Sequence, residues 1–254
     1  QAPGKARERV ATYRGRTSAG EVVPRGGDIY NDGDTDVVIY DWYQSGRIEA
    51  HKNQNGIGTS WSTEIPIPGS IRMHDIFLQD YDKDGDLDIA SRSQTLFNEN
   101  QGHQIWIFRQ GPIGTWTLIS PLIQTDPGEG LATGDIDGDT FLDLAVSGKW
   151  YKNPGSNILQ SWLEYSFAPA SWSWQDTQVA IGDMNNDGDP DVVLTPAESP
   201  GETYKISWFE APPDPTTGPW IEHIVENPVE AVYHSLQLAD ADLDGDLDIY
   251  TAEM

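Results

Sequence analysis

The stretch Asp80-Tyr81-Asp82-Lys83-Asp84-Gly85-Asp86-Leu87-Asp88-Ile89 decides the fold of this chain of 254 residues. It places carboxylates at positions 1, 3, 5 and 9 of a short loop, with a glycine at position 6. Oxygen-rich loops suit Ca²⁺, a hard cation that takes roughly six to eight oxygen ligands. The glycine supplies the backbone freedom that a sharp turn needs. The stretch therefore predicts a loop that binds a divalent cation.

This loop pattern occurs five times. The copies are 48 to 57 residues apart, and they begin at Asp28, Asp80, Asp135, Asp183 and Asp240. Periods of roughly 40 to 50 residues are typical of propeller blades. A second marker keeps the same phase, because a tryptophan precedes each of the last four loops by 19 to 21 residues, at Trp61, Trp116, Trp162 and Trp220. Two independent markers with one period predict a repeat architecture.

The side chains at positions 1, 3, 5 and 9 are the predicted metal ligands. In the second to fifth loops they are Asp80, Asp82, Asp84, Asp88, Asp135, Asp137, Asp139, Asp143, Asp183, Asn185, Asp187, Asp191, Asp240, Asp242, Asp244 and Asp248. The first loop offers the weaker set Asp28, Asp32 and Asp36, because Tyr30 stands at position 3. In the third loop Thr140 replaces the glycine at position 6. We expect three to five Ca²⁺ ions, with the second, fourth and fifth loops the most complete.

An EF-hand and a turn without metal are the two alternatives to this type of loop. An EF-hand loop ends in a bidentate glutamate at position 12 and lies between helices. Position 12 here holds no ligand, being Ile39, Ser91, Val146, Leu194 or Thr251, and the flanks are strand-like. The alternative is a solvated Asp/Gly turn without metal. Four or five clustered carboxylates repel one another unless a cation neutralises them, which favours the metal site.

The spacing of apolar segments and turns predicts an all-β fold. Each repeat holds four short strands separated by Gly- and Pro-rich turns, and helical periodicity is nearly absent. A radial array of four-stranded antiparallel blades, a β-propeller, would protect the strand edges. We assign residues 21–254 to this array. Residues 1–20 form an N-terminal segment that either contributes one strand, at 10–13, to another blade or remains a frayed tail.

The loop and the strand after it, as in residues 182–192, resemble the FG-GAP/VCBS repeat. This repeat builds the calcium-binding β-propellers of integrin α-chain heads and of many secreted bacterial proteins. The resemblance covers residues ~20–254 and implies Ca²⁺ in a β-hairpin loop on one face of the propeller. Family propellers commonly have seven or eight blades, so the five repeats would form a smaller ring or part of a longer one. Because Met254 follows the fifth loop so closely, we expect a propeller truncated at its C-terminus.

The negative charge of the chain limits the classes of partner that it can bind. The net charge is −26, and 22 of the 41 acidic residues lie inside the five loops. Such acidity argues against nucleic acid and anionic membranes as partners. No apolar run approaches the ~18 residues of a membrane span, and the chain has no cysteine for disulfides or thiolate catalysis. Calcium loops of low affinity suit an extracellular setting, secreted or on the cell surface, where Ca²⁺ is abundant.

A polar funnel is predicted at the opposite end of the innermost strands. His74 and His234 both lie six residues before the first Asp of a loop. The candidate ligand-binding residues are Arg72, His74, Glu129, Trp174, Gln175 and His234. Our first hypothesis is a non-enzymatic module that binds carbohydrate or a protein partner, as in cell adhesion. The alternative is a polysaccharide lyase or glycoside hydrolase in which His74 or His234 exchanges protons with Glu129.

Overall fold

The computed structural model of the chain describes residues 25–40, 48–62, 73–93, 103–119, 122–169, 172, 176–196, 203–229 and 233–253. Every regular element in these ranges is a β-strand, and all strand pairs are antiparallel. The all-β prediction is therefore confirmed for the described residues, and the EF-hand alternative is excluded because strands flank all five loops. The segment 1–20, Arg72, Trp174 and Gln175 lie outside these ranges.

The strands form five sheets that follow one another in chain order. The first sheet contains β1 (Arg25–Gly27), β2 (Asp36–Tyr40) and β3 (Ile48–His51). The second contains β4 (Met73–Gln79), β5 (Asp88–Ser93), β6 (Gln104–Gln110) and β7 (Trp116–Leu118), and β8 (Ile123–Gln124) also pairs with β6. In each sheet the first strand leads into an Asp loop and the second strand leaves it.

The remaining sheets repeat this plan. The third contains β9 (Ala132–Gly134), β10 (Asp143–Val146), β11 (Lys149–Lys152) and β12 (Leu163–Ser166). The fourth contains β13 (Thr177–Gly182), β14 (Asp191–Pro196), β15 (Tyr204–Glu210) and β16 (Ile221–Val229). The fifth has two described strands, β17 (Tyr233–Ala239) and β18 (Asp248–Glu253). The predicted four-stranded unit is thus complete in the second, third and fourth sheets.

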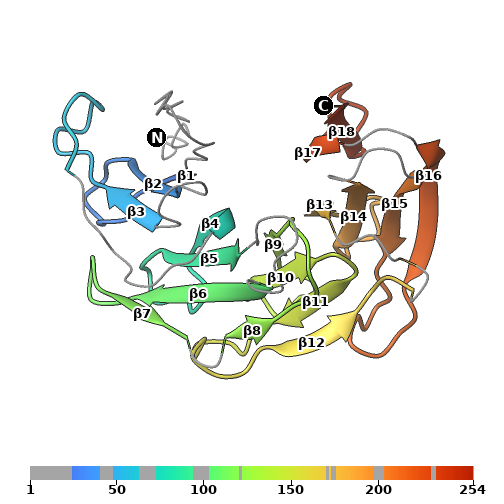
Figure 1. Cartoon of the computed structure of the whole chain (residues 1–254), viewed down its shortest axis with the longest axis horizontal. Helices are drawn as coiled ribbons and strands as arrows, with labels where there is room; N and C mark the ends of the chain where they lie inside the picture. The colour runs from blue at the N-terminus through green and yellow to red at the C-terminus, as the bar shows by residue number, and fades with distance from the viewer. Residues whose placement is uncertain are drawn as a thin grey trace, which may run out of the picture.

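The five sheets lie along an open arc, with the first and fifth sheets on either side of its opening (Figure 1). The first strands face the inside of the arc, where β1 contacts β4 and β13 contacts both β9 and β17. Glycine allows the close approach of these strands to the next sheet. A Cβ on Gly27 would lie 2.7 Å from Leu87, and a Cβ on Gly182 would lie 2.7 Å from Leu247.

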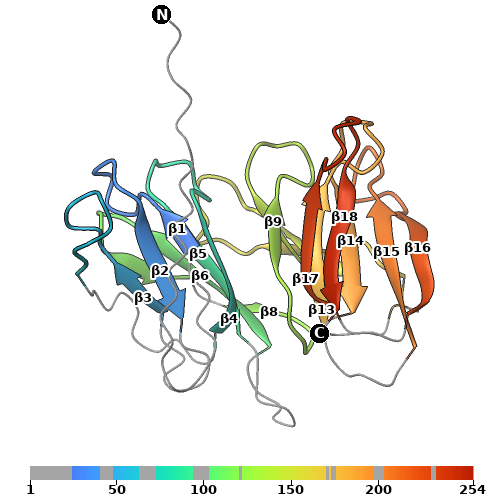
Figure 2. The ribbon, with the colours of Figure 1, turned by 90° about the horizontal axis from the view of Figure 1, so that it is seen from above.

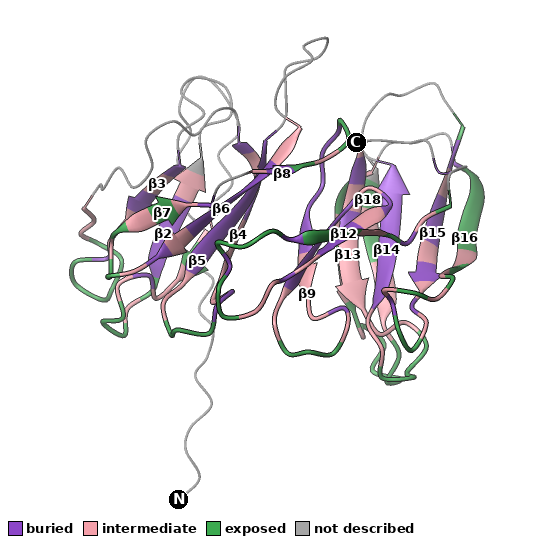
Figure 3. Cartoon of the chain, turned by 90° about the horizontal axis from the view of Figure 1, so that it is seen from below, coloured by how far each residue is buried: buried purple, intermediate pink, exposed green. Residues whose placement is uncertain are grey.

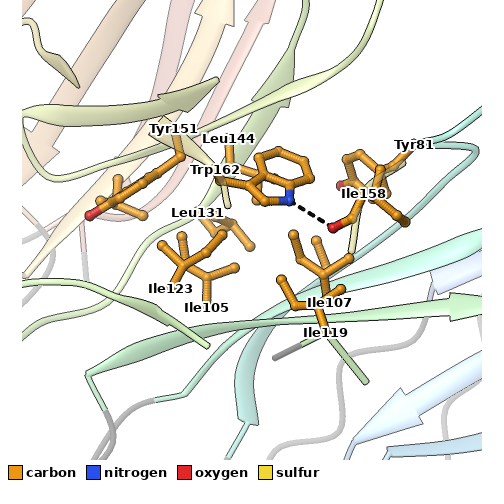
Figure 4. Packing of buried hydrophobic residues seen from close by; sticks show 12 residues of the cluster. Tyr81, Ile105, Ile107, Ile119, Ile123, Leu131, Leu144, Tyr151, Ile158 and Trp162 are labelled. Atoms are coloured by element: carbon orange, nitrogen blue, oxygen red, sulfur yellow. Dashed lines mark hydrogen bonds between the residues drawn. The ribbon is translucent and has the colours of Figure 1, made fainter. Parts of the chain in front are cut away.

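Apolar side chains fill the space between neighbouring sheets. Between the second and third sheets, Ile105 and Ile107 pack with Leu144, Tyr151 and Trp162 (Figure 4). Similar clusters join the first sheet to the second and the third to the fourth. The second strands β5, β10 and β14 are buried along their whole length. They are buried because neighbouring sheets cover both of their faces, and such strands need no alternation of polar and apolar residues.

The predicted tryptophan marker coincides with the fourth strand. Trp116 begins β7, while Trp162 and Trp220 directly precede β12 and β16. Trp61 pairs with Asn53 through an isolated β-bridge. The indole N–H of Trp162 donates to the carbonyl of Ile158 at 3.2 Å (Figure 4). The tryptophan repeat in the sequence therefore marks one structural position, the start of the fourth strand, in the second, third and fourth sheets.

Candidate metal centres

The five Asp loops share one backbone conformation. Positions 4 and 6 are left-handed in every loop, with φ between 50° and 71° at position 4 and between 77° and 102° at position 6. Glycine or asparagine tolerates such φ values best. Thr140 adopts φ 77° at position 6 of the third loop, where the other four loops have glycine. The third loop therefore keeps the backbone conformation of the other loops, although threonine replaces the glycine at position 6.

The carboxylate at position 1 holds the turn together. In the second loop Asp80 accepts the backbone N–H of Asp84 through Oδ1, at 3.1 Å, and that of Gly85 through Oδ2, at 3.0 Å. The first, fourth and fifth loops repeat both hydrogen bonds. In the third loop Asp135 Oδ2 accepts from Thr140, while its Oδ1 is buried and accepts no hydrogen bond.

The carboxylate at position 9 fastens each loop to its sheet. Asp36, Asp88, Asp143 and Asp191 are fully buried. Asp88 Oδ2 accepts the N–H of Tyr81, at position 2, and its Oδ1 accepts the N–H of Gln110, at the end of β6. Asp36, Asp143 and Asp191 accept the equivalent pairs of N–H groups. A buried acid at this position therefore has a structural role that does not depend on metal.

The buried acids carry perturbed pKa values. Burial raises the pKa of Asp88 and of Asp143 to about 7, and that of Asp191 to about 6. The neighbouring loop carboxylates raise these pKa values further, whereas the backbone N–H groups act in the opposite direction. The full negative charge of each cluster is thus costly in the protein alone, and a bound cation would relieve that cost.

The donor sets fit a hard cation. Four clusters each bring three carboxylate oxygens within 4.8 Å of one another: Asp28, Asp32 and Asp36; Asp80, Asp82 and Asp88; Asp135, Asp137 and Asp143; Asp240, Asp242 and Asp248. Oxygens that bind one Ca²⁺ at about 2.4 Å lie at most ~4.8 Å apart. The fourth loop supplies Asp183, Asp187 and Asp191 together with the amide oxygen of Asn185, which accepts the N–H of Asp187. The free Oδ1 of Asp135 is an acceptor that a cation would satisfy.

The loops lie together on one side of the molecule. They line one edge in Figure 2, and Figure 3 shows that the tips of the loops are exposed while the strands behind them are largely buried. Position 4 links neighbouring loops: the side chain of Asn31 donates to Asp86 at 2.6 Å, and that of Asn186 donates to Asp246. Lys83 likewise donates to Thr140 and lies 4.4 Å from the ring centre of Phe141.

The predicted ligand site is only partly assembled among the described residues. His74 lies between two acids, with Nδ1 at 3.4 Å from Asp75 and Nε2 at 3.3 Å from Glu129. Burial alone would lower the pKa of His74, but the charges of Asp75 and Glu129 raise it to about 9. His234 is exposed and lies in the fifth sheet. Both histidines fall where the strand register shifts, which confirms that they occupy equivalent positions.

Arg92 is a buried charged residue near this pair that the sequence analysis missed. It is fully buried in β5, and its guanidinium donates to the backbone carbonyls of Glu129, Gly130 and Asp126. Gly130 in turn donates its N–H to Asp75 at 3.0 Å. These bonds join the second sheet to the segment that leads into the third. A lone arginine in the stretch Ile89–Ser93 gave no periodic signal that could have identified it.

The comparison with known families agrees with this geometry. Residues 28–91, which span the first two loops, match the family model described as the FG-GAP-like repeat. This match confirms the resemblance noted in the sequence and identifies this part of the chain as FG-GAP-like. The third, fourth and fifth loops share the left-handed turns of the first two, and in each of them the N–H at position 6 donates to the acid at position 1. No curated protein matches the chain. Among the described residues no helix is long and apolar enough to cross a membrane.

Proposed function

We propose that this chain is a calcium-stabilised part of an extracellular β-propeller that binds a carbohydrate or a protein ligand. The observation that carries the proposal is the repeated constellation of oxygen ligands, acids at positions 1, 5 and 9 of every loop and at position 3 of three loops, placed on one side of five consecutive sheets (Figure 2). The open arc of sheets, with the first strands on the inside, supports a propeller arrangement (Figure 1).

Calcium has a structural role in this proposal. The ions would neutralise the clustered acids and hold each loop in its left-handed turns, so that binding favours the folded state by mass action. Melting of the protein in excess Ca²⁺ and in excess chelator tests the proposal. We expect the melting temperature to rise with Ca²⁺ by roughly 5 °C or more, because several sites contribute. Equal melting temperatures in Ca²⁺, Mg²⁺ and chelator would refute the calcium role.

The ligand would bind at the end of the sheets opposite the loops. His74 is half-buried at a strand irregularity, beside the buried carboxylate of Glu129. Irregularities of this kind often re-aim a side chain next to a functional site. Binding to an array of glycans and to extracellular matrix proteins, with His74→Gln as the matched variant, tests this surface. Ligand binding that is unchanged in His74→Gln would move the site elsewhere.

A second candidate function, polysaccharide cleavage, rests on the same histidine. With a pKa of about 9, His74 keeps its proton at neutral pH and would act as a proton donor rather than as a base. Turnover on a panel of acidic polysaccharides that disappears in His74→Gln would support this alternative. Turnover that His74→Gln leaves intact would assign cleavage to other residues.

A further inference from the structure

In the first three sheets, a basic residue at the end of the third strand contacts the Asp loop of the same sheet. Lys52, after β3, lies 2.8 Å from Asp32 and 5.0 Å from the ring centre of Tyr30. Arg109, in β6, pairs with Asp82 and with Asp84, the latter at 2.7 Å. These partners occupy positions 3 and 5 of their loops.

The third loop has the same arrangement. Lys152, the last residue of β11, pairs with Asp137 and with Asp139, the latter at 2.6 Å. In each of the three loops the next residue, Asn53, Gln110 or Asn153, donates its N–H to the acid at position 9. The basic side chain is therefore fixed by register to one place beside each loop. We call Lys52, Arg109 and Lys152 the basic arms.

The fourth loop reverses this charge. Ala211 donates the N–H to Asp191, so the residue in the place of the basic arm is Glu210. Glu210 pairs with His223 at 2.7 Å, and His223 stacks on Trp208 with ring centres 4.0 Å apart. In the described ranges no lysine or arginine forms an ion pair with the fourth loop.

A basic arm and a divalent cation need the same oxygens. Arg109 and Lys152 hold carboxylate oxygens at positions 3 and 5, which are the oxygens that a Ca²⁺ ion would use. Binding of the ion must break or weaken those ion pairs, and the fixed positive charge repels the ion at short range. Glu210 has the opposite effect, because it adds negative charge beside its loop.

We infer that the residue at the end of the third strand sets the cation affinity of each loop, so that the fourth loop binds Ca²⁺ more tightly than the first three. This inference depends on the proposed calcium role. At the ligand positions 1, 3, 5 and 9, Asn185 gives the fourth loop one carboxylate fewer than the second or third, so the charge of the ligands alone predicts the opposite order for these loops. The basic arms act as internal counter-ions that lower the dependence of the first three loops on metal.

Hydrogen–deuterium exchange of the whole chain, followed by mass spectrometry over a series of free Ca²⁺ concentrations, tests the inference. Peptides that cover each loop give a separate midpoint of protection for each loop in one sample. We expect the midpoint for residues 183–191 to lie at least tenfold below those for residues 80–88 and 135–143. If no loop gains protection with Ca²⁺, the proposed calcium role fails. If all loops gain protection at one midpoint, only the present inference fails.

Two substitutions test the cause. Lys152→Met should lower the midpoint of residues 135–143 about tenfold and leave that of residues 183–191 unchanged. Lys149→Met is the matched control, because Lys149 lies on the same strand but pairs with Asp126 and Glu164, outside the loop. In the fourth loop Glu210→Lys should raise the midpoint at least tenfold, and Glu210→Gln should have a smaller effect. A midpoint that Lys152→Met raises, or that Glu210→Lys leaves unchanged, would overturn the inference.

Discussion

The backbone N–H of Thr140 donates to Oδ2 of Asp135 at 2.9 Å, as the N–H of Gly85 donates to Asp80 at 3.0 Å. The third loop thus closes in the same way as the second, although a β-branched residue occupies the left-handed position. A left-handed conformation costs an L-residue with a side chain roughly 1–2 kcal/mol relative to glycine. The hydrogen bonds of the loop and its packing offset this strain.

Thr140→Gly should therefore stabilise the protein, by about 1 kcal/mol, because it removes the strain. The gain is reduced by the contact from Lys83, which donates to the Thr140 hydroxyl. Chemical denaturation of both proteins in chelator measures the difference without metal. The reverse change, Gly85→Thr in the second loop, should cost a similar amount. A less stable Thr140→Gly would show that the threonine side chain contributes more than its backbone conformation costs.

The acid at position 9 should matter more than the acid at position 7 of the same loop. Asp191 is fully buried and accepts N–H groups from Met184 and Ala211, each at 2.9 Å. Asp191→Ala leaves both donors without their partner, which should cost about 2–4 kcal/mol. Asp189→Ala removes a partly exposed carboxylate from the same loop and should cost less than about 0.5 kcal/mol.

Denaturant unfolding of these two variants in chelator separates architecture from metal binding. The difference between them should persist in chelator, because the hydrogen bonds of Asp191 do not involve an ion. If the two variants become equally stable in chelator, the acid at position 9 acts through the metal alone.

Much of this architecture could be predicted because the Asp loop fixes its own surroundings. Left-handed turns at positions 4 and 6, with an acid at position 9 that caps the following strand, require a tight connection between two antiparallel strands. The sequence predicts strands at residues 73–78 and 104–108, and β4 and β6 agree with these bounds to within two residues at either end. The tryptophan marker extended this reasoning to the outer strands, because it marks the start of the fourth strand in the second, third and fourth sheets.

The basic arms could not be predicted by the same reasoning. The residue that follows the arm lies 10 to 22 residues after position 9 in the first three loops, because the turn between the second and third strands varies in length. A fixed spacing in the sequence is absent, so only the strand register brings Lys52, Arg109 and Lys152 to equivalent places. The position of His74 between Asp75 and Glu129 likewise depends on contact between two sheets.

His74 should make the stability of the protein depend on alkaline pH. Its pKa is raised from 6.5 to about 9 in the folded protein by Asp75 and Glu129, against the opposing effects of burial and of Arg92. The folded state therefore favours the protonated imidazole. This contribution to stability is fully present below about pH 6.5 and is lost as the pH rises through about 9.

Melting temperatures between pH 6 and 9.5 should fall by several degrees in the natural sequence, and by less in His74→Gln. His223→Gln is a suitable control, since His223 also pairs with an acid, Glu210, but both residues lie in the fourth sheet, whereas His74 lies in the second. An equal slope in His74→Gln and in the natural sequence would show that other groups dominate the pH dependence in this range.

The side chain at position 4 should couple one loop to the next. Asn186 donates from the fourth loop to Asp246 of the fifth, as Asn31 donates from the first loop to Asp86 of the second. Gly138 occupies position 4 of the third loop, so no side chain extends from there to the fourth loop.

Asn186→Ala should increase hydrogen exchange in residues 240–248 by a few-fold, because one exposed hydrogen bond contributes about 1 kcal/mol. Leu243→Ala is the matched control, since Leu243 also occupies position 4 but is 85 % exposed. Faster exchange in residues 80–88 as well would indicate general loosening, and unchanged exchange in residues 240–248 would show that the neighbouring loops fold independently.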